Sequence, residues 1–253
     1  MNPYTKNINR MEFVITYACT GRCKHCSEGE HTLSGEHLDG DIAAQAVIKV
    51  ASAYSLTSLM TFGGEPLLHP EEVCKIHSAA TAVGIPKRQL ITNGFFSKDV
   101  VKIAEVASAL AKSGVNDVLL SVDAFHQETI PLEPVKAFAN EVLKAGVPIR
   151  TSPAWLVSKA DKNPYNTKTR EILSEFAKMG IDEADGNVIF PSGNALKYLS
   201  EYFDADSEYI NPYEENPEDV NTVCFDPNGD VLGSNVYKTD ILEIINSYDP
   251  KNI

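Results

Sequence analysis

Positively charged side chains are in short supply in this chain of 253 residues. Lysine and arginine number 22 and aspartate and glutamate 35, which gives a net charge of −13. Because binding to a nucleic acid normally needs a basic face, the composition predicts no nucleic-acid partner. The sequence also lacks an apolar run of membrane-spanning length, and residues 1–6 lack the apolar core of a signal peptide. We therefore expect no contact with a membrane.

Cysteine is sparse as well, and three of the five cysteines are gathered in one stretch. They have the spacing C-x3-C-x2-C, at Cys19, Cys23 and Cys26. The apolar run at residues 11–17 predicts a buried strand directly before them. Three thiolates on a loop after a strand can hold three irons of a cubane cluster, which leaves the fourth iron free to bind a small molecule. A zinc knuckle is the alternative, with His25 or His31 as its fourth ligand.

The two remaining cysteines limit the number of cofactors. Cys74 lies among apolar residues of an expected helix, so we interpret it as part of the core. That leaves Cys224, whereas a second cluster needs about four ligands. The sequence therefore predicts a single cluster. An open iron is sensitive to oxygen and needs a reducing compartment, which predicts a cytoplasmic location.

Short apolar runs alternate with amphipathic stretches along most of the chain. Strands are expected at residues 11–17, 58–62, 89–92, 117–122, 147–157 and 187–190. Helices are expected at residues 42–50, 70–83, 98–112, 133–144 and 167–178. Strand followed by helix, repeated in this way, predicts parallel βα units that close toward a barrel. The expected fold is therefore α/β, a partial (β/α)6 TIM-like barrel over residues 1–200, with the ligand-binding residues at the carboxyl ends of its strands.

Residues 201–253 differ in pattern, and we expect them to form a short C-terminal extension. Residues 204–220 carry seven acidic side chains and no lysine or arginine. They are interpreted as a solvated loop or, alternatively, as a lid or docking surface for a basic substrate. Residues 222–232, with a tight turn at 226–229, predict a β-hairpin. A helix is expected at residues 239–247.

Two motifs together carry a resemblance to a known family. The cysteine triplet and Gly63-Gly64-Glu65-Pro66, which follows the second expected strand, resemble motifs of the radical S-adenosylmethionine (SAM) superfamily. Residues 190–195 resemble the P-x-G turn of that family, and the match extends over residues 10–200. The resemblance implies a [4Fe–4S] cluster on the three cysteines. It also implies that SAM binds at the open iron, with Gly63, Gly64, Glu65 and Pro66 around its methionine amino group.

The resemblance implies further residues that bind the cofactor. Asn93 ends the third strand, and Ser121 and Asp123 end the fourth, where polar side chains of the family reach the ribose or carboxylate of SAM. Asn93 and Asp123 can equally be caps at strand ends. Arg150 is expected to meet a carboxylate, either that of SAM or that of Asp123. His25 stands where the family usually has an aromatic residue; a histidine there can stack beside the adenine, and it titrates near neutral pH.

The resemblance implies an enzyme that cleaves SAM reductively to a 5′-deoxyadenosyl radical, with an electron donor such as flavodoxin or ferredoxin. The acidic tail and the extension, which resembles a shortened maturase extension, favour a ribosomally made peptide as the substrate. Cys224 is then either a buried core thiol or a hydrogen-atom donor that makes the net reaction an epimerisation. His126 either contacts the substrate or lies on the surface. The alternatives are rearrangement, dehydrogenation or C–C bond formation on a small metabolite, and a non-catalytic iron–sulfur or redox-sensing protein.

Overall fold

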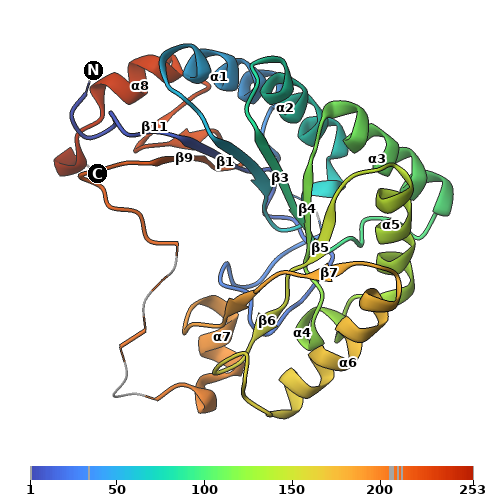
Figure 1. Cartoon of the computed structure of the whole chain (residues 1–253). Coiled ribbons are helices and arrows are strands. Elements are labelled where there is room, and N and C mark those ends of the chain that lie inside the picture. Colours follow the sequence, from blue (N-terminus) through green and yellow to red (C-terminus); the bar gives the residue numbers. More distant parts are fainter. Residues whose placement is uncertain (1, 34, 205–207, 210, 212, 253) are drawn as a thin grey trace.

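Among the residues that the structure describes, seven parallel strands form one curved sheet (Figure 1). The computed structural model describes the whole chain except residues 1, 34, 205–207, 210, 212 and 253. The strand order is β7-β5-β4-β3-β2-β1-β9. These strands are β1 (Arg10–Val14), β2 (Ser58–Phe62), β3 (Lys87–Thr92), β4 (Asp117–Leu120), β5 (Ile149–Thr151), β7 (Asp182–Glu183) and β9 (Thr222–Phe225). Because β7 and β9 lie at its two edges, the sheet is an open, partial barrel, as expected.

Helices cover the convex side of the sheet and leave the concave side open (Figure 1). They are α1 (Gly40–Ala53), α2 (Pro70–Ala82), α3 (Val100–Ser113), α5 (Leu132–Lys144), α6 (Pro164–Lys178) and α8 (Ile241–Ser247). The local sequence determines their ends: Asp39 caps α1, Asp99 caps α3, and Gly114 ends α3 in the left-handed region with φ 87°. All six expected helices are present, and their ends differ from the expected ones by at most three residues. Two short helices, α4 (Ala124–Gln127) and α7 (Gly193–Tyr198), were not expected from the sequence.

Buried apolar and partly exposed polar residues alternate along the strands, so the sheet has one apolar face and one polar face. Met11 and Phe13 of β1 are fully buried in the core under the helices, whereas Glu12 between them is partly exposed. The strand register places Glu12 in one row with Gln89 and Asp117 of the neighbouring strands. The Gln89 amide donates a hydrogen bond to the Asp117 carboxylate at 2.8 Å. The hydrophobic core therefore lies between sheet and helices, and the concave face carries polar side chains.

The expected fifth and sixth strands are wrong in detail. Instead of continuing to residue 157, β5 ends at Thr151, and β6 (Ala154–Trp155) begins after Pro153, which has no N–H to donate to a ladder. β8 (Asn187–Val188), in the place of the expected sixth strand, pairs with β6 outside the main sheet. β7 occupies the place beside β5 instead. A strand of two residues leaves too short an apolar pattern to be recognised in a sequence.

The hairpin expected in the C-terminal extension is also placed wrongly. β9 does not pair with the segment that follows it but runs parallel to β1, as a further strand of the main sheet. The hairpin lies further along, between β10 (Asp230–Val231) and β11 (Ser234–Asn235). Its turn, Leu232-Gly233, has positive φ at both residues, 49° and 72°, which suits a two-residue hairpin loop.

Contacts with the start of the chain hold this extension in place. Phe225 of β9 stacks on Phe13 of β1, with ring centroids 4.7 Å apart. The N–H of Val220 donates to the carbonyl of Tyr4 at 2.8 Å. The division of the chain near residue 200 stays a prediction. Of the acidic stretch, Asp206 and Pro212 lie outside the described residues. No helix in the described part of the chain is both long and apolar enough to cross a membrane.

Candidate cofactor site

The three cysteines of the triplet lie on the loop that follows β1. Cys19 and Cys23 are buried, Cys26 is partly buried, and all three are free thiols. Burial raises the pKa of Cys19 to about 12, so this thiol keeps its proton at neutral pH unless a metal binds it. A metal ion removes the proton of a thiol that coordinates it.

Nitrogen atoms of neighbouring residues approach two of these sulfurs. The backbone N–H of Gly21 donates to Cys19 Sγ at 3.3 Å, and the side-chain amide of Asn93 reaches the same sulfur at 3.6 Å. His31 Nε2 lies 3.1 Å from Cys26 Sγ. Hydrogen bonds to sulfur stabilise thiolate ligands and are a regular feature of iron–sulfur sites. The donor set of three thiols, with N–H partners at Cys19, therefore fits an iron–sulfur cluster.

The two glycines after β2 allow the cysteine loop to pack on their backbone. The N–H of Gly64 donates to the Thr16 carbonyl at 2.7 Å, and that of Glu65 donates to the Ala18 carbonyl at 2.8 Å. A Cβ at Gly63 would lie 2.6 Å from the Thr16 oxygen, and one at Gly64 would lie 2.2 Å from the Ala18 oxygen. Any larger residue would therefore push the two strand ends apart. The motif continues with Pro66, which begins a short 3-10 helix, Pro66–Leu68.

The Glu65 carboxylate joins the ends of β2 and β3. It accepts the N–H of Leu67 at 2.9 Å, the hydroxyl of Thr92 at 2.7 Å and the N–H of Asn93 at 2.8 Å. The side chain is fully buried, and burial raises its pKa to about 7 despite these hydrogen bonds. Glu65 therefore holds the ends of β2 and β3 together even without a bound cofactor. Its contact with the methionine amino group stays a prediction.

Asn93 is turned toward the cysteine loop, and Ser121 follows the end of the neighbouring strand β4. Besides its contact with Cys19, the Asn93 amide donates to the Thr20 hydroxyl at 3.2 Å, and its oxygen accepts the Phe95 N–H at 2.8 Å. Ser121 is partly exposed just beyond β4, and its N–H donates to the Thr92 carbonyl at 2.8 Å. That either side chain binds SAM stays a prediction.

Asp123 begins α4 as its cap, as the alternative interpretation proposed. Its carboxylate accepts the N–H groups of Phe125 and His126, each at 2.9 Å, and that of Ala154 at 3.0 Å. It also accepts the His126 Nδ1–H at 2.8 Å. Burial would raise its pKa, but the charge and hydrogen bond of His126 outweigh burial and lower it. Burial in turn would lower the pKa of His126, and Asp123 together with Cys23 raises it well above its usual value.

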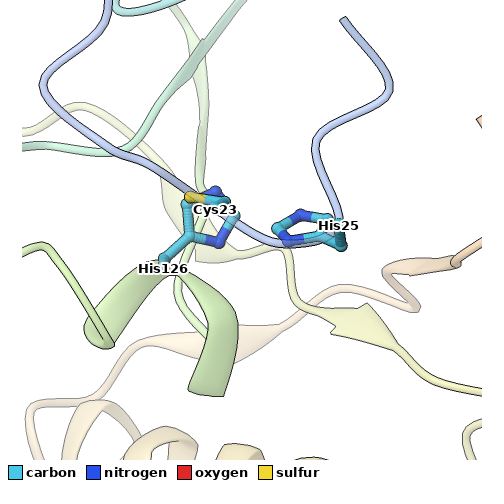
Figure 2. Close-up of side chains that lie close together, drawn as sticks. All are labelled: Cys23, His25 and His126. Atoms are coloured by element: carbon cyan, nitrogen blue, oxygen red, sulfur yellow. The ribbon is translucent and has the colours of Figure 1, made fainter. Parts of the chain in front are cut away.

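His126 and His25 lie beside Cys23 (Figure 2). One ligand atom from each of the three residues lies within 4.8 Å of the others. The two imidazole rings are 4.8 Å apart between centroids, and the His25 ring is 5.1 Å from that of Phe125. Burial lowers the pKa of His25 to about 4, so the expectation that it titrates near neutral pH is wrong. His126 is likewise no surface residue, because it is held between Asp123 and the cysteine loop.

Arg150 lies in β5, as the sequence predicted, but its carboxylate partner is a different one. Its guanidinium pairs with Asp117 at the beginning of β4, 2.9 Å from each carboxylate oxygen. The expected contact with Asp123 is therefore wrong, since the Asp123 carboxylate accepts hydrogen bonds from His126 and from the first turn of α4. The side chain is 41% exposed, so Arg150 is not a buried cation that needs a partner at the strand ends. Contact with the SAM carboxylate would require Arg150 to leave Asp117.

The beginning of α7 supports the cysteine loop from the opposite side of the partial barrel. The Asn194 N–H donates to the Cys26 carbonyl at 2.9 Å, and its side-chain amide donates to the carbonyls of Cys23 and Gly29 at 3.1 and 3.0 Å. A Cβ at Gly193 would lie 2.5 Å from the Cys26 oxygen. The sequence indicated only a turn at residues 190–195. These contacts were not predictable because their partners are about 165 positions away.

Cys224 lies on the concave face of β9, in register with Glu12 of β1. Its thiol is exposed, so its interpretation as a buried core thiol is wrong. Desolvation by the surrounding protein is the largest cause that raises the pKa of this thiol, to about 12, and the carboxylates of Glu12 and Glu28 add to it. The thiol is therefore protonated at neutral pH. Cys74, by contrast, packs partly buried against the core, as expected.

A parallel, open sheet with a cysteine triplet at its carboxyl edge is the arrangement of an iron–sulfur protein built on a partial barrel. The chain matches the family model of the radical SAM superfamily over residues 13–191. Because this match covers most of the chain, the protein belongs to the radical SAM superfamily. It is a radical SAM enzyme, and the cofactors of its family are a [4Fe–4S] cluster and SAM.

Similar proteins agree with this assignment. GTP 3′,8-cyclase of Desulforamulus reducens is 33% identical over 129 residues, 50% of this chain and 38% of the cyclase. Among solved structures, anSMEcpe with bound AdoMet superposes with a TM-score of 0.58 at 14% identity, over 97% of this chain and 79% of that one. SuiB of Streptococcus suis bound to S-adenosylmethionine has a TM-score of 0.56 at 13% identity, over 96% and 66%. The structural matches show the fold, and the sequence match spans under half of the cyclase.

Proposed function

We propose that this radical SAM enzyme inverts the configuration of one carbon in a ribosomally made peptide, with Cys224 as the hydrogen-atom donor. The observation that carries the proposal is the position of the Cys224 thiol. It is exposed on the concave face of the sheet, on the strand that the C-terminal extension adds beside β1. A thiol in this position is open to a substrate held inside the partial barrel.

The residues at the strand ends serve to bind the cofactors. When bound, the cluster and SAM supply the 5′-deoxyadenosyl radical that removes a hydrogen atom from a substrate carbon. We place the cluster on the cysteine triplet, and SAM beside the Gly63-Gly64-Glu65-Pro66 loop. Asn93, Ser121 and His25 lie around that place. The expected partner is a one-electron donor of the flavodoxin or ferredoxin class.

Cys224 would complete the reaction on the other face of the substrate carbon. Its S–H bond breaks, the hydrogen atom forms a new C–H bond at the substrate radical, and a thiyl radical remains on sulfur. One electron from the flavodoxin or ferredoxin and one proton from water restore the thiol. The step requires a protonated thiol, and with its raised pKa the Cys224 sulfur carries its hydrogen at neutral pH.

Two observations favour a peptide as the substrate. The acidic stretch contributes a carboxylate, Glu215, to the negative charge around Cys224, which suits a basic chain. In addition, anSMEcpe has been solved with AdoMet and the Cp18Cys peptide, and that structure superposes on this chain with a TM-score of 0.55 at 14% identity. A fold of this type can therefore accommodate a peptide.

A small metabolite is the second candidate substrate. It is favoured by the sequence similarity to the GTP 3′,8-cyclases, whose name refers to a nucleotide. The peptide and the small metabolite can be distinguished through Cys224, since only the epimerisation of a peptide proposed here needs a thiol to return a hydrogen atom.

The experiment is turnover in D2O after anaerobic reconstitution with iron, sulfide, dithionite and SAM. Substrates are GTP and synthetic peptides encoded by short reading frames beside the gene. Wild type should place one deuterium in a peptide product, through the exchangeable thiol. Cys224→Ala should still form 5′-deoxyadenosine but no epimer, and Cys74→Ala, the matched control, should behave as wild type. Normal epimer from Cys224→Ala, or turnover of GTP alone, would refute the proposal.

A further inference from the structure

The two edges of the main sheet differ in how well they could accept a further strand. β7 has only two residues, Asp182 and Glu183, and both are exposed and acidic. Short length and charged side chains are common ways in which an edge strand is protected from pairing. β9, at the other edge beside β1 (Figure 1), has four residues and no charged side chain. No other described strand pairs with β9, so its second side is free of strand pairing.

The pairing with β1 determines which backbone groups face that second side. The carbonyl of Asn221, directly before β9, accepts the N–H of the first residue of β1 at 3.2 Å, so Asn221 faces β1. Successive residues of a strand face opposite neighbours, and Thr222 and Cys224 therefore turn their N–H and C=O groups away from β1. The Asp226 N–H, next in this series, donates to the Asp230 carbonyl at 3.1 Å, within the turn that follows β9. The free part of the edge is therefore Thr222 and Cys224.

The side chains of β9 connect this edge with the concave face. Val223 and Phe225 are buried in the core, whereas Cys224 between them is exposed on the concave side. A strand added at the edge would lie about 4.8 Å from β9, with its backbone beside the Cys224 thiol. Hydrogen bonds between main chains give such an added strand affinity whatever its sequence.

The charge around this edge is negative. Asp219 precedes β9 and Asp226 follows it, and residues 198–237 contain no lysine or arginine. A basic peptide therefore meets opposite charge here and no repulsion. A second copy of this chain, with its net charge of −13, would bring more negative charge to the same edge. The electrostatics thus favour a basic peptide over pairing between two copies.

We propose that an extended, basic segment of the peptide substrate binds as a further strand on the free edge of β9, where it pairs with the backbone of Thr222 and Cys224. This strand anchors the peptide and holds the residue to be modified near the thiol. The inference rests on the peptide substrate of the proposed function, and it is independent of hydrogen transfer from Cys224 and of epimerisation.

The first test is the Kd of the reconstituted enzyme for fluorescently labelled synthetic peptides encoded by short reading frames beside the gene, measured by anisotropy without SAM, so that no turnover occurs. Thr222→Pro removes an outward N–H, which an edge strand tolerates. Thr222→Val, the matched control, keeps this N–H and loses only the hydroxyl. We expect Thr222→Pro to raise Kd about three- to tenfold and Thr222→Val to bind as wild type. Equal Kd values for wild type and Thr222→Pro, or equal weakening in both variants, would overturn the proposal.

A second measurement on the wild-type enzyme covers the case in which Thr222→Pro does not fold. The peptide that binds is synthesised with one backbone N–H methylated at a time. Because every second residue of an added strand faces β9, the losses of affinity should recur at every second position. Hydrogen exchange should show the amides of Thr222 and Cys224 unprotected in the free enzyme and protected with the peptide. Losses without this period, or amides that stay unprotected, would contradict the pairing.

The outcomes separate this inference from the proposed function. Binding with the period of two but no epimer would refute the epimerisation and leave the added strand in place. Epimer formation without the period would refute the added strand alone, and the absence of any peptide binding would refute both. A dimer in analytical ultracentrifugation, with the amides of Thr222 and Cys224 protected before any peptide is added, would assign the edge to a second copy of this chain and overturn the proposal.

Discussion

At the scale of single residues, Glu65 combines full burial with an ionisable group. A carboxyl group whose folded pKa is raised binds its proton more tightly in the folded state, so it favours folding at low pH and this contribution is lost as pH rises. For Glu65 the window runs from the usual 4.5 to about 7. Above pH 7 the buried charge costs the fold on the order of 3 kcal/mol relative to acidic pH.

The pH dependence of unfolding should therefore differ between wild type and Glu65→Gln. In protein without cofactors, the free energy of unfolding of wild type should fall relative to that of the variant between pH 4.5 and about 7. Denaturant titrations at several pH values measure this difference. Parallel curves for the two proteins would mean that the Glu65 carboxyl is ionised throughout, held so by the donors from Thr92, Leu67 and Asn93.

At the scale of elements, the beginning of α7 and the cysteine loop depend on each other. Gly193→Ala would introduce a Cβ 2.3 Å from the Ser27 carbonyl oxygen and 2.5 Å from that of Cys26. The loop would have to move, so we expect a large loss of bound iron after reconstitution. Iron and sulfide analysis of the purified variant measures this loss.

Gly180→Ala is the control for that variant. Gly180 also has a positive φ, 79°, but a Cβ there would have no neighbour within 4 Å. It should therefore show the cost of a left-handed alanine, about 1–2 kcal/mol, with full iron content. Equal iron in both variants would mean that α7 does not position the cysteines.

At the scale of the whole molecule, the C-terminal extension completes the sheet beside β1. Phe225 is fully buried against Phe13, and α8 contributes Ile244 and Ile245 to the main core. A chain that ends at residue 200 would expose these contacts. We expect it to aggregate or to unfold at a much lower temperature than the full chain, as measured by circular dichroism. Cooperative unfolding of residues 1–200 near the wild-type temperature would instead support a domain boundary there.

The sequence by itself determined the class of the protein and most of its elements. The cysteine spacing, the Gly-Gly-Glu-Pro motif and the helix caps are local, because each depends on residues a few positions apart. They predicted the partial barrel, the six helices and the cofactor edge of the sheet. Motifs of this kind can be recognised in a sequence because backbone sterics and ligand spacing act over short distances.

Only the tertiary structure decided which side chains meet across the site. Asp117 rather than Asp123 receives Arg150, Asn194 reaches the cysteine loop, and β9 joins β1 rather than its own neighbour. Each of these outcomes depends on partners at least thirty positions apart, so no local pattern records them. The exposure of Cys224 has the same cause: the face that a strand turns to solvent depends on the strand with which it pairs.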